Sequence, residues 1–388
     1  MSTQASELDS ASAGLTSSAS KAGRLISLDQ FRGYTVAGMF LVNFIGSYEA
    51  IKASLPILKH HHTFCSYADT IMPQFFLAVG FAYRLTFLRR RETKGTRSAY
   101  LHVLTRNLGL LLVAFVIHRL DGQYDSWSKL QETGFWGVVS VAFQRNFFQT
   151  LAHIAVASLW CLPVIAARPV WRISYAVFSA VLFHVLSEYW YYDWVMARPG
   201  IDGGPLGFLT WTVPLIAGTL AYDWVASTSR PPVARLLFAG TVIMAIGYAL
   251  SCVNLVTPPN DAPVSSDWKA LLIEPPFVPP TRPVNIWTMS QRAGSVSYLT
   301  FGAGFSLAVY ALFALACDMG RLEIGVFRTL GTNALAGYIL HSLVNQAIKP
   351  FLPKDSPLWY VWCGFAVSFG ICYLFLRHLE KNRLFLKL

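Results

Sequence analysis

The stretch KHHHTFCSYADTIMPQFFLAVGFAYR, residues 59–84, sets titratable side chains directly against an apolar run. The run is long enough to enter a lipid bilayer, and it carries Asp69 at its start and Arg84 at its end. Charged side chains inside such a segment cost free energy and usually serve function. The stretch therefore predicts a membrane-spanning helix with the mouth of an active site at its start.

The composition of the whole chain is that of a membrane protein. Of its 388 residues, 54% are hydrophobic and 13% are charged, against about 25% charged in a typical soluble domain. The net charge of +11 suits the cytoplasmic loops of a membrane protein, so no nucleic-acid partner is expected. The six cysteines are scattered without a CxxC pair, which is typical of small core residues. The sequence holds no Asn-x-Ser/Thr sequon, which favours a bacterial plasma (inner) membrane.

Apolar segments predict an all-α, polytopic helical bundle with about ten transmembrane helices, each long enough to cross a hydrocarbon core. The segments lie near residues 31–50, 69–88, 100–118, 147–167, 172–190, 206–224, 234–254, 298–317, 326–347 and 358–377. Residues 1–25, rich in Ser and Ala, predict a disordered cytoplasmic tail. Residues 26–388 are expected to form the membrane domain, with a Pro-rich outer loop at about 255–297 that either covers a site or is a passive linker.

The distribution of basic residues sets the predicted orientation. With the N-terminus inside, the short basic loops RRRETKGTR, ARPVWR and SRPPVAR all fall on the cytoplasmic side. An even number of spans then places both termini in the cytoplasm.

Polar and titratable side chains collect at the predicted outer ends of the spans. The histidines there are His60, His61, His62, His118, His153, His184 and His341. Asn43, Asp69, Glu188 and Asn345 lie on the same side, so a bundle is expected to bring these groups to one outward-facing cavity. A single histidine in such a helix also serves as a plain interhelical hydrogen-bonding group. The histidine spacing does not fit a shared ion, so no metal is expected.

Three arginines are candidates for binding an anion from the inner side. Arg32 lies in the first turn of the first span, where it opposes the helix dipole, and it either holds an anion or pairs with Asp29 as a membrane anchor. Arg106 lies inside the third span and is the stronger candidate. Arg84 is the third.

Four segments carry a resemblance to a known family. They are SLDQFRGYTVAGMFLVN (27–43), YADTIMPQFFLAVGFA (67–82), PLGFLTWTVPLIAGTLAYDW (205–224) and TLGTNALAGYILHSLV (329–344). In this order the chain resembles the heparan-alpha-glucosaminide N-acetyltransferase family and its bacterial relatives. The resemblance implies a transmembrane acyltransferase that moves an acetyl group from cytosolic acetyl-CoA, its cosubstrate, to an amino sugar or other glycan on the opposite side.

The resemblance also implies catalytic residues. The essential histidine of the family lies shortly before the motif aspartate, which matches Asp69, and an asparagine at the end of the first span matches Asn43. His60 is closest in register, with His61 and His62 as competitors. The family's Trp-Asn-Gly stretch is replaced here by HHHTFCSYAD, which leaves the acceptor open among glycans, amines and hydroxyls.

The expected mechanism joins the two sides of the membrane. Arg32, Arg106 and Arg84 would hold the phosphates of CoA at the inner face, and the pantetheine arm would thread the bundle. His60 would deprotonate the acceptor or carry the acetyl group, and Asn43 would donate to the oxyanion.

His341, Asn345 and Glu188 are expected to line the same cavity. The partners are acetyl-CoA, the acceptor and the lipid bilayer, with a homodimer left open. Two other functions compete: a proton-coupled transporter that uses the buried His, Asp and Glu groups, and a non-catalytic polysaccharide-export component.

Overall fold

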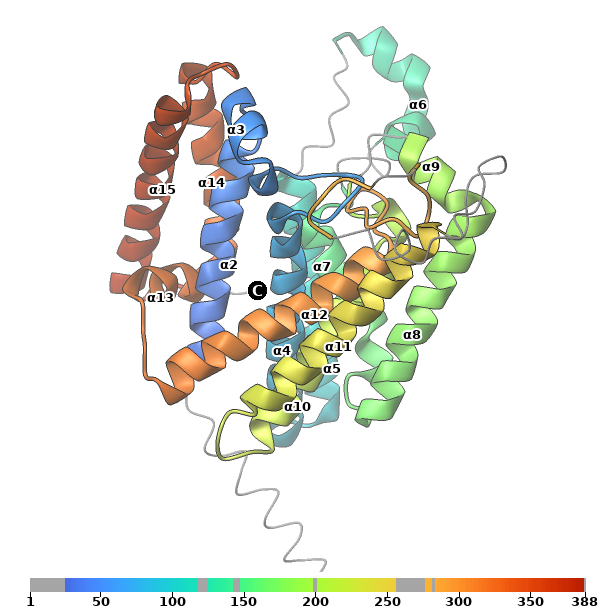
Figure 1. Cartoon of the computed structure of the whole chain (residues 1–388), viewed down its shortest axis with the longest axis vertical. Coiled ribbons are helices and arrows are strands. Elements are labelled where there is room, and N and C mark those ends of the chain that lie inside the picture. Colours follow the sequence, from blue (N-terminus) through green and yellow to red (C-terminus); the bar gives the residue numbers. More distant parts are fainter. Residues whose placement is uncertain are drawn as a thin grey trace, which may run out of the picture.

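All the regular structure that the computed structural model describes is helical (Figure 1). The described residues are 25–117, 125–141, 147–197, 201–255, 276–280 and 283–386. The predicted tail, residues 1–25, lies outside them apart from its last residue. Most of the predicted Pro-rich loop lies outside them as well, although its end from residue 283 onward is described.

The long helices follow the apolar runs of the sequence. In chain order the helices are α2 (Ile26–Ile45), α3 (Glu49–Ser54), α4 (Tyr67–Lys94), α5 (Thr96–Ile117), α6 (Trp127–Val141), α7 (Thr150–Trp160), α8 (Pro169–Leu186), α9 (Tyr192–Ala197), α10 (Phe208–Ala226), α11 (Val233–Cys252), α12 (Val296–Phe313), α13 (Gly325–Thr332), α14 (Ala334–Ile348) and α15 (Leu358–Lys381). A π-helical turn, Ser187–Tyr191, joins α8 to α9, and another, Ala314–Met319, extends α12.

Within the described ranges, seven helical segments are long and apolar enough to cross a membrane. They contain α4, α5, α8 with α9, α10, α11, α12 and α15. The chain is therefore an integral membrane protein built as a helical bundle. The other three predicted spans correspond to α2, α7 and α14, of which α7 and α14 have only 11 and 15 residues. A total of about ten spans stays a prediction.

Two predicted boundaries differ from the structure for local reasons. Helix α2 begins at Ile26 rather than near residue 31, and the Asp318 carboxylate accepts the backbone N–H of Ser27 at 3.1 Å. A distant side chain thus satisfies one of the free donors at the helix start. The predicted span 326–347 is broken at Asn333, whose φ of −124° and ψ of 43° separate α13 from α14.

Glycines allow α4 and α10 to pack in direct backbone contact. A Cβ atom added to Gly80 would lie 1.9 Å from the carbonyl oxygen of Leu215, and one added to Gly218 would lie 2.1 Å from that of Leu77. Small residues at such a crossing are typical of helix packing inside membranes, where close backbone approach replaces the hydrophobic driving force. The α4–α10 pair therefore forms a tightly packed part of the core.

A buried ion cluster joins α4, α8 and α10 at the end of α4 far from Asp69. Arg84 Nε donates to Asp223 Oδ1 at 3.0 Å, and its Nη1 donates to the carbonyl oxygen of Ile165. The fully buried Arg172 donates to the other oxygen of Asp223 and to Thr219 Oγ1. Two cations thus share one carboxylate, which makes Asp223 the charge that holds the three helices together.

Candidate active site

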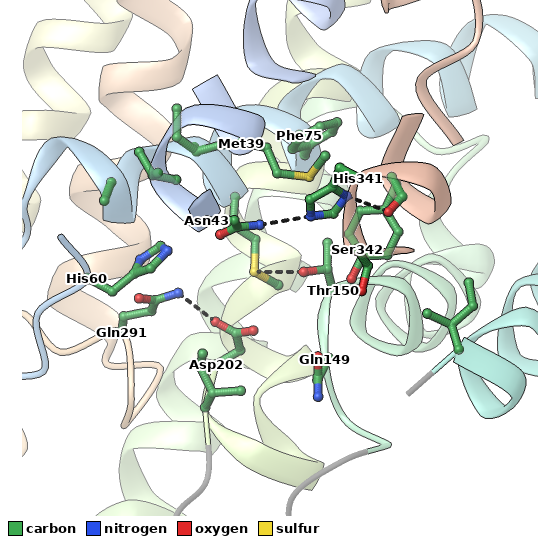
Figure 2. Close-up of a pocket in the computed structure, with 17 residues that line it drawn as sticks. Met39, Asn43, His60, Phe75, Gln149, Thr150, Asp202, Gln291, His341 and Ser342 are labelled. Atoms are coloured by element: carbon green, nitrogen blue, oxygen red, sulfur yellow. Dashed lines mark hydrogen bonds between the residues drawn. The ribbon is translucent and has the colours of Figure 1, made fainter. Parts of the chain in front are cut away.

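A cavity of about 290 Å³ lies where α2, α4, α7 and α14 meet the loops that precede α4, α10 and α12 (Figure 2). Most of its polar lining comes from residues far apart in the sequence, namely Asn43, His60, Thr150, Asp202, Gln291 and His341. Among the described residues that line it, none is Lys or Arg. The described lining mixes polar and apolar side chains, and its titratable groups are a carboxyl group, two imidazoles and the phenol of Tyr338.

His60 and Asp69 form a hydrogen-bonded pair at the wall of this cavity. The distance between His60 Nδ1 and Asp69 Oδ1 is 2.9 Å. Because the carboxylate accepts, Nδ1 carries the proton, and Nε2 is the nitrogen that is not bonded to Asp69. The Gln291 side chain also interacts with this ring. The Asp69 side chain is fully buried, whereas 32% of the His60 side chain is exposed. The pair has the arrangement of an oriented general base.

The first turn of α4 fixes the Asp69 carboxylate. Ser66 is the N-cap of α4, and its backbone N–H donates to Asp69 Oδ2 at 2.9 Å, as in a capping box. The backbone N–H of His61 donates to the same oxygen at 3.3 Å. The Tyr298 hydroxyl anchors the backbone of the turn by donating to the carbonyl oxygen of Asp69 at 2.6 Å. The pattern Ser-x-x-Asp is visible in the sequence and shows that Asp69 has a structural role as well.

The three consecutive histidines, all described by the structure, have different surroundings. His61 Nε2 donates to the carbonyl oxygen of Pro56 at 2.9 Å, and its ring stacks on Phe64 with centroids 4.0 Å apart. His62 is exposed. Of the three imidazole rings, only that of His60 lines the cavity and bonds the Asp69 carboxylate. The geometry therefore distinguishes between residues that the sequence left as competitors.

Burial and charge act in opposite directions on the histidines. Burial lowers the pKa of His60, but the hydrogen bond and the negative charge of Asp69 outweigh it, so the pKa is raised above its ordinary value. Burial, followed by the positive charge of Arg292, lowers the pKa of His62. Low-dielectric surroundings disfavour the charged form, and a nearby carboxylate restores it.

Asn43 and His341 form the second polar pair of the cavity. His341 Nδ1 donates to the carbonyl oxygen of Tyr338 at 2.6 Å, which leaves Nε2 as an acceptor in the neutral ring. Asn43 Nδ2 donates to that Nε2 at 3.3 Å. The ring of Phe40 stacks on His341 with a centroid distance of 5.5 Å. One N–H of the Asn43 amide is thus used, and the second remains.

Asp202 and Gln291 also line the cavity, although the sequence pattern had not indicated them. Gln291 Nε2 donates to Asp202 Oδ1 at 3.0 Å (Figure 2). Asp202 is 3% exposed, and its backbone has a φ of 60°. The only signal in the sequence is IDGG, in which an Asp that tolerates the left-handed conformation precedes two glycines in a loop.

Other predicted cavity residues lie elsewhere. Glu188 is exposed on the π-helical turn after α8. Asn345 is buried between α14 and α15, where it accepts a hydrogen bond of 2.8 Å from Ser368 Oγ. His153 packs in the core against Trp211.

Of the two remaining predicted outer histidines, only one is described by the structure. His184 lies against Trp287 with ring centroids 4.1 Å apart. His118 lies outside the described residues.

The three candidate arginines have different environments. Arg32 lies 3.6 Å from Asp29. Its positive charge and that of Arg106 are close enough to repel one another. Arg106 forms no ion pair with any residue that the structure describes, whereas Arg84 is engaged by Asp223. The structure thus brings Arg32 and Arg106 together and leaves Arg84 in the ion cluster.

Comparison of the chain with protein-family models and with curated proteins finds no match in either set. Across the described ranges, no group of three or more His, Cys, Asp or Glu side chains has an arrangement that could hold a metal ion.

Proposed function

We propose that the protein is a membrane acyltransferase that transfers an acetyl group from acetyl-CoA to an amino sugar or another glycan, amine or hydroxyl acceptor on the outer side of the membrane. The observation that carries this proposal is the His60–Asp69 pair, which presents one imidazole nitrogen to a polar cavity. An imidazole oriented by a buried carboxylate suits removal of a proton from a nucleophile near neutral pH.

Two routes use the same nitrogen. In the first, His60 Nε2 takes the proton of the acceptor as the acceptor attacks the thioester. In the second, Nε2 itself attacks, and a transient acyl-imidazole passes the acetyl group on. In both routes a negative charge develops on the carbonyl oxygen. The second N–H of Asn43, the one not used by His341, is the donor that we assign to it.

The donor is proposed to enter from the opposite side of the bundle. The phosphates of CoA are anions, and Arg106 provides a cation inside α5 without an ion pair among the described residues. Arg32 adds a second charge close by. Arg84 shares Asp223 with Arg172 and so has less charge to offer an anion. We therefore assign the phosphate contact to Arg32 and Arg106.

Substitution of the three histidines one at a time tests the proposal. The purified protein, reconstituted in liposomes, is supplied with labelled acetyl-CoA and candidate acceptors, and both acetyl transfer and release of the CoA thiol are measured. His60→Ala is expected to lower the rate by about 10²- to 10⁴-fold, the usual contribution of a general base. His62→Ala, the matched control on an exposed neighbour, and His61→Ala should retain most of the activity.

Full activity of His60→Ala would refute the proposed role. Proton-coupled transport is the second candidate. One observation favours it: His60 and Asp202 line the same cavity, and the Asp69 carboxylate bonds His60. Release of free CoA thiol that depends on His60 separates the two, because a transporter leaves the thioester intact.

A further inference from the structure

Asp202 lies in the cavity with half of its carboxyl group unused. Its Oδ1 accepts the hydrogen bond from Gln291, and Oδ2 makes no hydrogen bond to any residue in the described part of the chain. Because the residue is 3% exposed and lines the cavity, that oxygen has access to the cavity rather than to the protein surface. A buried carboxyl group with a free oxygen is unusual unless a ligand or a reaction uses it.

Gln291 lies between Asp202 and His60 (Figure 2). Its side chain bonds Asp202 and also interacts with the His60 ring, and the charges of His60 and Asp202 act on one another. The cavity therefore has two proton-carrying groups, His60 and Asp202, with the neutral amide of Gln291 between them. His60 is a base oriented by Asp69, whereas Asp202 is an acid that forms no ion pair with a Lys or Arg in the described part of the chain.

The backbone holds Asp202 in place at some cost. The residue adopts a left-handed φ of 60°, and Trp211 Nε1 donates to its carbonyl oxygen at 2.9 Å. The next residue, Gly203, donates its N–H to the carbonyl oxygen of Arg292 at 3.1 Å. Backbone conformations of this kind persist where the surroundings enforce them, and they concentrate at functional sites.

We propose that Asp202 is the general acid of the acyl transfer, an inference that rests on the proposed function. As the acceptor forms its bond to the acetyl carbon, its proton passes to His60 Nε2. As the bond between that carbon and sulfur breaks, the electron pair leaves on sulfur, and the Asp202 carboxyl group gives its proton to the thiolate. The products are the acetylated acceptor and the neutral CoA thiol. Return of one proton from His60 to Asp202 restores the starting state without net uptake.

The environment of Asp202 supports this assignment. Burial raises its pKa to about 7, so the protonated form persists near neutral pH, although the hydrogen bond from Gln291 and the charge of His60 oppose the rise. Paired groups whose environments suit one to give a proton and the other to accept one are typical of acid–base catalysis. The titratable groups that act on Asp202 come from the loop before α4, from α4, and from α12 and α14: His60, Asp69, Tyr298 and Tyr338.

The test compares Asp202→Asn with wild type on two acyl donors. Asn keeps the shape, tolerates the left-handed backbone and still accepts the bond from Gln291, but it cannot give a proton. With acetyl-CoA the variant should lose about 100-fold or more in kcat/KM. With an aryl thioester of acetic acid, whose thiolate leaves without a proton, it should stay within about threefold of wild type. Asp193→Asn, which removes an exposed carboxylate on α9, is the matched control.

The assignment would be overturned if Asp202→Asn lost kcat/KM equally on both acyl donors, or if it lost none on acetyl-CoA. The pH profile provides a second criterion, because removal of an acid abolishes the alkaline limb of kcat/KM and leaves the acid limb of His60 in place. A profile that keeps its alkaline limb in Asp202→Asn contradicts the role.

An infrared measurement makes the test independent of turnover. Below neutral pH, wild type should show the carbonyl band of a buried protonated carboxylic acid, and Asp202→Asn should lack it. Absence of the band from wild type would overturn the proposal. If wild type shows the band but transfers no acetyl group, the proposed function fails and the acid assignment fails with it. If wild type transfers the acetyl group but Asp202→Asn does so equally well, only the acid assignment fails.

Discussion

Asp69→Asn tests the link between the start of α4 and the chemistry of His60. The two carboxylate oxygens have different partners: Oδ1 accepts from His60, and Oδ2 accepts the backbone N–H groups of Ser66 and His61. Asparagine offers only one acceptor, and its amide nitrogen can only donate. The variant therefore must leave either the histidine or the helix start without its acceptor.

The number of hydrogen bonds that are kept determines which orientation the new amide group adopts. If the Asn oxygen takes the place of Oδ2, it keeps two backbone bonds and the cap, whose loss would cost about 0.5–2 kcal/mol. The amide nitrogen then donates to His60 Nδ1, which forces the proton of the neutral ring onto Nε2. The nitrogen that should accept a proton is then occupied. We expect a fall of about 10²- to 10⁴-fold in kcat/KM with a loss of only about 1–2 kcal/mol in stability.

The pH dependence gives a second, signed expectation. In wild type the pKa of His60 is raised, because Asp69 outweighs burial, and the neutral base exists only above that pKa. Without the carboxylate, burial lowers the pKa against only the smaller opposing effects of the Asp202 charge and the Gln291 hydrogen bond, so the acid limb of kcat/KM should move to lower pH.

The raised pKa of His60 also determines how the stability of the fold depends on pH. The His60–Asp69 pair stabilises the fold below the unfolded pKa of about 6.5, and this contribution is lost as pH rises through the folded pKa. The difference in stability between wild type and variant should therefore narrow with rising pH. The assays are release of CoA thiol across pH and thermal denaturation in detergent. An acid limb that does not move, together with wild-type turnover, would show the reasoning to be wrong.

Three further substitutions test other parts of the structure. Asp223→Asn leaves two buried arginines without their shared carboxylate and should lower the free energy of unfolding by about 3–5 kcal/mol, measured by thermal denaturation. Asp355→Asn, the control at an exposed position, should change the melting temperature little. Gly80→Ala places a Cβ atom against a backbone carbonyl of α10 and should lower the free energy of unfolding by about 1–3 kcal/mol in the same assay. Gly370→Ala on α15, where the added Cβ meets open space, should leave the stability unchanged or raise it. Glu188→Gln should leave acetyl transfer unchanged, because that side chain is exposed away from the cavity; a large loss would contradict the site.

The sequence predicted the helices better than their ends. Apolar runs indicate where a chain can lie in lipid, and the resulting class, an integral helical membrane protein, is confirmed. The start of α2 depends on Asp318, almost the whole chain away, and the break at Asn333 depends on a non-helical backbone inside an apolar run. Hydropathy contains neither piece of information, because it averages over neighbours along the chain.

The candidate site was predictable only in part. Asn43, His60 and His341 line one cavity, as their predicted position at one side of the bundle suggested. Asp202 and Gln291 come from loops, and only the crossing of the helices brings those loops to the cavity. Glu188 lies at the predicted end of its helix, but its side chain is exposed rather than directed into the cavity. The sequence could not predict this, because the rotation of a helix about its axis is undetermined when the segment is apolar on nearly every side.

The capping box at the start of α4 has a consequence for how the protein loses activity. Because the same carboxylate closes the first turn and orients the imidazole, any thermal fraying of that turn also releases His60. Local opening at a helix terminus needs far less free energy than global unfolding. Heating should therefore abolish the proposed acetyl transfer before the bundle melts, and hydrogen exchange at the Ser66 and Asp69 amides should follow the same temperature curve as the loss of transfer.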